Sequence, residues 1–88
     1  RMDALWEWAE QHDLFTIATS GRAPRDYRDP GYLFPALLLL GSEAEGLPAD
    51  VIERADRAVS IPMVGTASSL NLAVAAGLLL YELRRQQS

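Results

Sequence analysis

PALLLLGSEAEGL, residues 35–47, is the stretch of sequence on which the fold depends. An apolar run as short as residues 36–40 fits either a buried helix segment or a buried strand, and periodicity does not separate the two. The bounding Pro35 and Gly41 favour a strand that is buried on both faces, as in a parallel sheet. The strand stops at a glycine-rich acidic turn, which is how α/β proteins build ligand crevices at the carboxyl ends of their strands.

The segments on either side supply two more strands and three helices. The expected elements, in chain order, are a helix over residues 2–12, a strand over 14–19, an exposed loop over 22–34, the strand over 36–40, a helix over 48–56, a strand over 58–61 and a helix from Ser68 or Ser69 to about Arg85. The apolar face of the first helix is expected to hold Leu5, Trp8, Ala9 and His12, with both tryptophans packed. This order predicts an α/β fold whose small parallel sheet is flanked by helices.

Length and composition limit the classes of protein to consider. A chain of 88 residues makes one small domain at most. It has no Cys, which excludes a disulfide framework and a thiolate metal site, and we expect no metal and a cytoplasmic setting. The apolar stretch over residues 72–83 is too short for a bilayer span, so no membrane partner is expected. The net charge is −4, so any contact with nucleic acid must use local basic patches.

The final helix is apolar on nearly all sides. One face is expected to hold Leu70, Ala73, Val74, Gly77, Leu78 and Tyr81, and the other sides hold further leucines and alanines. A terminal helix cannot cover both faces with a sheet this small. We therefore expect a homodimer through this helix, in which Ala73, Ala76 and Gly77 allow close approach.

The turn from Gly41 to Gly46 has the glycine spacing that opens a phosphate-binding P-loop. The match ends there, because Leu47-Pro48 follows where a P-loop needs Lys and then Ser or Thr. Glu43 and Glu45 would also repel phosphates, and no G-x-G-x-x-G dinucleotide fingerprint is present. The turn therefore suits a neutral or cationic ligand better than a nucleoside triphosphate.

Three segments together resemble a known family. LLLGSEAEGLP at residues 38–48, IPM at 61–63 and SSLNLAVA at 68–75 resemble the second and third motifs of the SpoU (TrmH) branch of the SPOUT RNA methyltransferases. The motifs occur in the family's order and spacing, and the resemblance covers roughly residues 15–86.

The resemblance implies an α/β domain with a carboxyl-terminal trefoil knot, with S-adenosylmethionine bound in the knot crevice. It implies transfer of the cofactor's methyl group to a ribose 2′-hydroxyl of transfer or ribosomal RNA. In this family most cofactor contacts come from the main chain, which fits the Gly and Pro residues in the motifs. The cofactor contacts that it implies are Thr19, Leu40, Gly41, Gly46, Ile61, Met63 and Leu70.

The resemblance also implies catalytic positions. Glu43 and Asn71 match the family's acidic and amide positions, and Ser69 matches the motif serine. The family's first motif, which carries an arginine thought to activate the 2′-hydroxyl, has no counterpart here. Residues 1–88 are therefore expected to form the carboxyl-terminal part of the catalytic domain, and no arginine of this chain is assigned that role.

Simpler interpretations of the same residues stay open. Glu43 can be a carboxylate near the amino end of the next helix, Ser69 a helix cap, and Asn71 a first-turn residue bonded to nearby backbone. The loop over residues 22–28, with its arginines and Tyr27, can grip phosphates and stack on an unpaired base, or can be only a solvated loop. The chain as a whole is either part of an RNA methyltransferase or a non-catalytic module that binds S-adenosylmethionine and dimerises.

Overall fold

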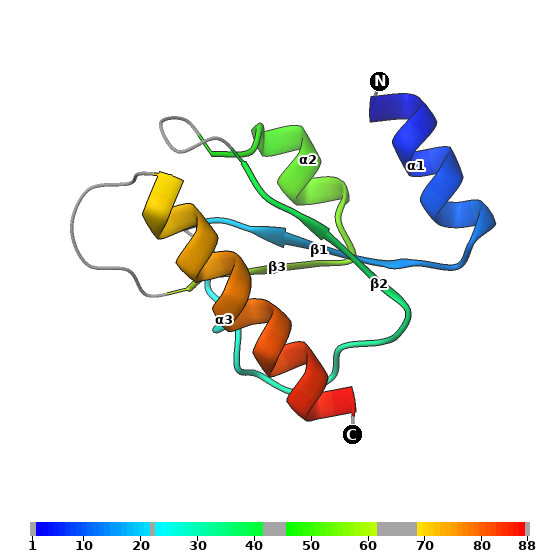
Figure 1. Cartoon of the computed structure of the whole chain (residues 1–88). Coiled ribbons are helices and arrows are strands. Elements are labelled where there is room, and N and C mark those ends of the chain that lie inside the picture. Colours follow the sequence, from blue (N-terminus) through cyan, green and yellow to red (C-terminus); the bar gives the residue numbers. More distant parts are fainter. Residues whose placement is uncertain (1, 22, 42–45, 62–68, 88) are drawn as a thin grey trace.

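Three helices and three strands make up the fold (Figure 1). The computed structural model describes residues 2–21, 23–41, 46–61 and 69–87. The elements are α1 (Met2–Gln11), β1 (Phe15–Thr19), β2 (Ala36–Leu39), α2 (Ala49–Arg54), β3 (Arg57–Val59) and α3 (Ser69–Gln87). Their kind and order are those predicted from the sequence, and the boundaries differ by one to two residues at most ends.

The three strands form one parallel sheet in the order β2-β1-β3. β1 is the central strand, with Ala18 opposite Leu39 of β2 and Thr19 opposite Val59 of β3. The predicted α/β class and parallel sheet are thus confirmed. β2 lies at the edge of the sheet, and within it only Leu39 is fully buried, so the expectation that the whole run is buried on both faces is wrong.

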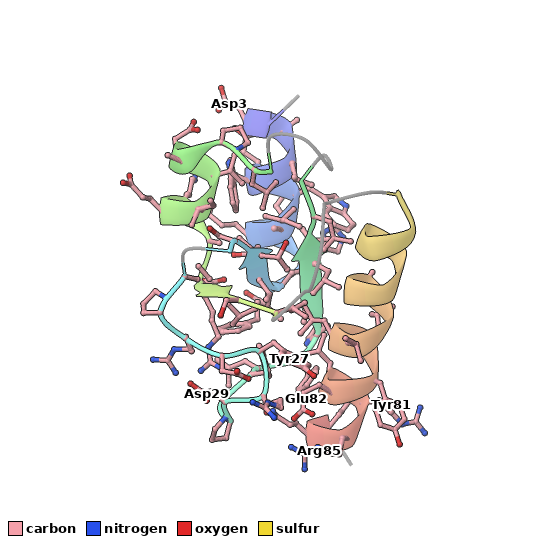
Figure 2. The ribbon with its side chains drawn as sticks, turned by 90° about the vertical axis from the view of Figure 1, so that its left-hand side faces the viewer. Asp3, Tyr27, Asp29, Tyr81, Glu82 and Arg85 are labelled. Carbon is pink, nitrogen blue, oxygen red and sulfur yellow. The ribbon has the colours of Figure 1, made fainter. Side chains whose placement is uncertain are left out.

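Helices cover both faces of the sheet, α3 on one side and α1 with α2 on the other (Figures 1 and 2). The alternation of side chains along each strand divides the core accordingly. The cluster on the α3 side is built from Ile17, Tyr32, Val59, Leu79 and Leu83. The cluster on the other side is built from Trp6, Leu39 and Val51. The molecule therefore has three layers, with the sheet in the middle.

The buried face of α1 differs from the one predicted. Trp6 is 7% exposed and Ala9 is buried, whereas Trp8 is 47% exposed and His12 is exposed. Trp6 packs with the α2 side of the core, and the guanidinium carbon of Arg54 lies 4.9 Å from the centre of its ring. Because α1 has apolar residues on several sides, the contact with α2 decides which tryptophan is covered.

The loop between β1 and β2 is packed rather than simply exposed, which corrects the prediction for residues 22–34. Tyr32 is buried in the α3-side cluster, and its hydroxyl donates to the carbonyl oxygen of Tyr27 at 2.5 Å. The Arg57 guanidinium lies 4.7 Å from the centre of the Tyr32 ring and donates to the carbonyl oxygen of Pro30 at 3.1 Å. These contacts make the end of the loop part of the core.

α3 buries one side and exposes the other. Leu79, Glu82 and Leu83 are buried, whereas Leu80 and Tyr81 are 57% and 76% exposed. Figure 2 shows Tyr81 pointing away from the sheet, while Glu82 lies on the side of the loop that carries Tyr27. Within the described ranges, no helix has the length and apolar character needed to cross a membrane.

Candidate functional site

The described cofactor-binding candidates gather at the edge of the sheet where the strands end. Thr19 is the last residue of β1, Leu40 and Gly41 follow β2 directly, and Ile61 follows β3 by two residues. The strands are parallel neighbours, so these positions meet at one edge. The Ser20 amide extends the pairing there, donating to the carbonyl oxygen of Val59 at 3.0 Å.

The start of α3 lies on the same side of the molecule as the carboxyl ends of the strands (Figure 1). Ser69, Leu70 and Asn71 form the first turn of this helix, although the placement of their side chains is outside the described part of the structure. Glu43 and Met63 also lie outside the described residues. The backbone positions of the predicted site that the structure describes are therefore brought to one edge.

The turn after β2 closes on itself at its two glycines. A Cβ atom at Gly41 would lie 2.6 Å from the Cα atom of Gly46 and would also overlap main-chain atoms of Leu47. Gly46 adopts a φ of 71°, a left-handed conformation that glycine takes without strain. Both positions therefore favour glycine, Gly41 for lack of space and Gly46 for its backbone conformation.

This edge offers main chain and apolar groups to a ligand. Thr19, Leu40 and Ile61 are half-buried, so each has part of its surface open to solvent. Among the described residues, no atom lies within 4 Å of a Cβ atom placed on Gly46, so these residues leave the backbone there open to a ligand. Such an edge suits recognition of a nucleoside-like molecule through peptide groups and apolar contacts.

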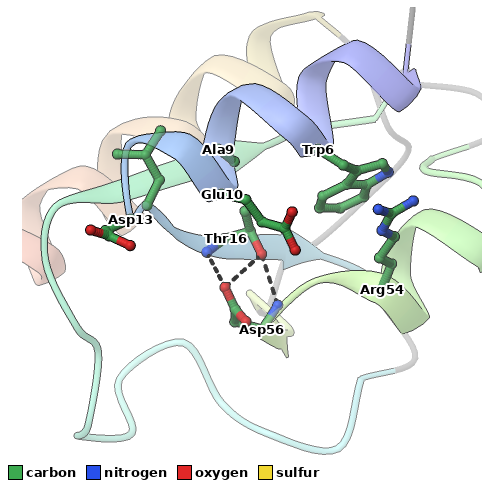
Figure 3. A pocket seen from close by; sticks show the side chains of 8 residues that line it. Trp6, Ala9, Glu10, Asp13, Thr16, Arg54 and Asp56 are labelled. Atoms are coloured by element: carbon green, nitrogen blue, oxygen red, sulfur yellow. Dashed lines mark hydrogen bonds between the residues drawn. The ribbon is translucent and has the colours of Figure 1, made fainter.

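A shallow pocket of about 250 Å³ lies at the opposite end of the strands, between α1 and the residues that precede β3 (Figure 3). Trp6 and Arg54 form one wall, and Glu10 and Asp56 lie near Thr16 on the other side. None of the predicted site residues lines this pocket. In the described ranges, no group of three or more His, Asp or Glu side chains is arranged to hold a metal ion.

Thr16 and Asp56 form a reciprocal link at that end which the sequence analysis missed. The Asp56 carboxylate accepts hydrogen bonds from the Thr16 amide at 2.8 Å and from the Thr16 hydroxyl at 3.0 Å. The Asp56 amide donates to the Thr16 hydroxyl at 2.8 Å. The two residues are 40 positions apart, so no local sequence pattern predicts their contact. It fixes the start of β3 beside β1.

Comparisons with known proteins agree on one family. The sequence model described as the SpoU rRNA Methylase family matches residues 1–81. The chain is 42% identical over 62 residues to a tRNA (guanosine(18)-2′-O)-methyltransferase of Aquifex aeolicus, an alignment that covers 70% of this chain and 29% of that protein. It is 36% identical over 83 residues to the 23S rRNA (guanosine-2′-O-)-methyltransferase RlmB of Haemophilus influenzae, covering 94% of this chain and 34% of the relative.

Solved structures support the same assignment. A crystal structure of an RNA 2′-O ribose methyltransferase superposes with a TM-score of 0.81 at 41% identity, covering 97% of this chain and 33% of that one. The SpoU methyltransferase AviRb from Streptomyces viridochromogenes, in complex with AdoMet, superposes with a TM-score of 0.81 at 36% identity, covering 99% and 35%.

The chain spans only about a third of the length of these relatives. The family match over residues 1–81 includes α1, the whole sheet, the turn after β2 and most of α3. The sequence match, the parallel sheet and the superpositions lead to one conclusion: this chain belongs to the SpoU rRNA methylase family.

Proposed function

We propose that the protein containing this chain transfers the methyl group of S-adenosylmethionine to a ribose 2′-hydroxyl of transfer or ribosomal RNA. The observation that carries the proposal is the meeting of three strand ends, the turn between Gly41 and Gly46, and the start of α3 at one edge. Relatives with this architecture are named as RNA 2′-O-methyltransferases, and one was crystallised with AdoMet.

The cofactor is proposed to bind across this edge. Its contacts would be Thr19, Leu40, Gly41, Gly46, Ile61, Met63 and Leu70. The fit rests on the Gly46 backbone, which no other described residue covers, and on the half-buried side chains at the strand ends. When bound, the cofactor supplies an electrophilic methyl group, and the protein supplies position and proton handling.

Glu43, Ser69 and Asn71 are the proposed catalytic residues. Ser69 and Asn71 belong to the first turn of α3, whose start lies at the same edge as the strand ends. An amide and a hydroxyl there can orient the ribose hydroxyl, and a carboxylate on the turn after β2 can accept its proton.

The larger assembly is proposed to follow the same family pattern. Residues 1–88 would form the carboxyl-terminal part of a cytoplasmic methyltransferase domain, with a carboxyl-terminal trefoil knot. The exposed outer side of α3, with Leu80 and Tyr81, would pair with a second copy of the chain. Gly77 is exposed on α3 and fits this interface, whereas Ala76 is half-buried one turn before the buried Leu79.

The test uses the intact protein. Calorimetry with S-adenosylmethionine should give saturable binding, and the protein should transfer methyl groups to the 2′-hydroxyls of bulk transfer or ribosomal RNA. Glu43→Ala and Asn71→Ala should each lower the transfer rate by about a hundredfold or more, a size typical of lost acid–base or orienting groups, with cofactor affinity retained. Glu53→Ala, at an exposed position on α2, is the matched control.

The outcomes separate the two functions considered. Absence of binding heat at millimolar cofactor would contradict both an enzyme and a binding module. Cofactor binding by the intact protein without transfer to any RNA would instead support the non-catalytic module.

A further inference from the structure

Two arginines among the described residues of the loop between β1 and β2, Arg25 and Arg28, are exposed, and they differ in their partners. The guanidinium of Arg28 forms an ion pair, in which its Nε atom lies 3.0 Å from the Asp26 carboxylate. Tyr27 is half-buried and packs against the α3-side cluster. Arg25 is exposed, and no hydrogen bond or ion pair joins its side chain to the described part of the chain.

The main chain places Arg25 at the edge proposed to bind the cofactor. The carbonyl oxygen of Arg25 accepts from the Ser60 amide at 2.8 Å, and the Tyr27 amide donates to the Ser60 carbonyl oxygen at 3.0 Å. A parallel bridge between Asp26 and Ser60 lies between these bonds. Ser60 separates β3 from Ile61, so the Arg25 segment continues the sheet beyond β3 at its carboxyl end.

Hydrogen bonds from two other elements, α3 and β3, fix the main chain of residues 28–30, which follow Arg25. The Gln86 side-chain amide at the end of α3 donates to the carbonyl oxygens of Arg28 and Asp29, each at 3.2 Å. From β3, the Arg57 guanidinium donates to the carbonyl oxygen of Pro30 at 3.1 Å. A backbone that is already fixed loses little conformational entropy on binding, so Arg25 is presented on a rigid support.

The positive charge of Arg25 matters because the chain as a whole is negatively charged. The whole chain carries a net charge of −4, which disfavours the approach of a polyanion. The nearest carboxylate in sequence, that of Asp26, is paired with Arg28, so it does not neutralise Arg25. A guanidinium that pairs with no described carboxylate, beside a proposed RNA-modifying site, is suited to a phosphate group, which it can hold with two parallel hydrogen bonds.

We infer that Arg25 grips a backbone phosphate of the RNA next to the nucleotide whose ribose is methylated. The inference rests on the proposed function and adds to it a residue that positions the RNA substrate. Arg25 acts on RNA affinity, not on the cofactor or on the chemical step.

The experiment compares the intact protein with its Arg25→Ala, Arg25→Lys and Arg54→Gln variants. Arg54→Gln removes the same charge at the opposite end of the strands, where Arg54 lines the pocket beside Trp6. Three quantities are measured: S-adenosylmethionine affinity by calorimetry, kcat and KM for methyl transfer to bulk transfer RNA and bulk ribosomal RNA, and RNA affinity as a function of salt.

Arg25→Ala should raise the KM for RNA about three- to tenfold and leave kcat and cofactor affinity unchanged. The slope of log affinity against log salt should become shallower by about 0.7 to 0.9, the value for one phosphate contact. Arg25→Lys should retain part of the affinity, since it keeps the charge but loses the planar fork.

Two results would overturn the inference. One is an Arg25→Ala variant with the same RNA KM and salt slope as Arg54→Gln, which would make Arg25 a solvated surface residue. The other is a loss of cofactor affinity or of folding in both Arg25 variants, which would make its role structural. If the unsubstituted protein neither binds the cofactor nor methylates RNA, the proposed function itself fails, and that outcome is distinct from these two.

Discussion

Gly41 and Gly46 are glycines for two different reasons within the same turn. At Gly41 the main chain of Gly46 and Leu47 occupies the space that any side chain would need. At Gly46 no described atom lies within 4 Å of where a Cβ would be, and the constraint is the left-handed φ of 71°. The first is a packing constraint and the second a conformational one, so alanine should have a different effect at each.

Gly41→Ala should lower the free energy of unfolding by about 1–3 kcal/mol, the cost of strain stored in a backbone that has to move. Gly46→Ala should lower the free energy of unfolding by about 1–2 kcal/mol, because the left-handed backbone conformation is the only constraint that alanine violates there. Gly21→Ala is the control, since a Cβ atom there meets nothing within 4 Å, and it should change stability by less than about 0.5 kcal/mol. Urea unfolding of the three variants measures these differences, and equal stability of Gly41→Ala and Gly21→Ala would contradict the described turn.

Single residues were predictable from sequence where a strand end or a motif fixed them. Thr19, Leu40, Gly41 and Ile61 lie at strand ends as expected, because parallel neighbours bring those ends together. Trp8 was predicted to pack and is exposed, since the choice between it and Trp6 depends on where α2 lies. Only the folded chain brings Thr16 and Asp56 together.

At the scale of elements, α3 is attached to the loop between β1 and β2 by polar groups of its last two turns. The Glu82 carboxylate accepts from the Arg85 guanidinium and from the Gln86 amide, which in turn donates to loop carbonyls. Hydrogen bonds from Arg85, then from Gln86, lower the pKa of Glu82 from its ordinary value of 4.5. The ionised form of Glu82 is therefore the one that the fold stabilises.

The lowered pKa of Glu82 predicts an acid-sensitive contact. Because the pKa is lower in the folded than in the unfolded chain, the contribution to stability is complete above about pH 4.5 and is lost as pH falls through the folded pKa. Glu82→Gln should therefore weaken the acid dependence of unfolding, measured as thermal midpoints from about pH 6 to about pH 3. Glu53→Gln, exposed on α2, is the charge-matched control. An unchanged acid profile in Glu82→Gln would show that this contact does not stabilise the fold.

Elements were predicted better than the loop that joins β1 to β2. The strands and helices are predicted by apolar periodicity and by the Gly, Pro and Ser residues at their ends, and these are local features of the sequence. Residues 22–34 have the charges and prolines of a solvated loop, yet Tyr32 is buried. Its burial depends on Arg57 and on α3, which are far along the chain, so local composition does not reveal it.

At the scale of the whole molecule, α3 carries several large apolar side chains that the rest of the chain does not cover. Leu78, Leu80 and Tyr81 are exposed, and Tyr81 points away from the sheet (Figure 2), while Leu79 and Leu83 fill the core. Exposed apolar groups grouped on one helix are typical of an interface between subunits. These exposed side chains support the proposed homodimer through α3.

Gly77→Arg should convert the proposed dimer of the intact protein into monomers, because a long charged side chain would enter the helix interface. Light scattering gives the mass directly. Ala4→Arg, at an exposed position on α1, should leave the mass unchanged. A dimer mass for Gly77→Arg would remove this face of α3 from the proposed interface.

The fold class of the whole chain was predictable because strand and helix patterns alternate, which in small domains gives a parallel sheet covered by helices. The sequence analysis did not predict the strand order, with β1 in the centre, since all three strands are apolar enough to be central. β2, the most apolar of the three, nevertheless lies at the edge.

The amide of Gln86 connects two distant parts of the chain, because it bonds to the carbonyl oxygen of Arg28, 58 positions earlier. Any tilt of the last turn of α3 would pull on the backbone that supports Arg25. In the proposed dimer, a contact on the outer side of α3 that tilted this turn would therefore also shift the main chain on which Arg25 is mounted.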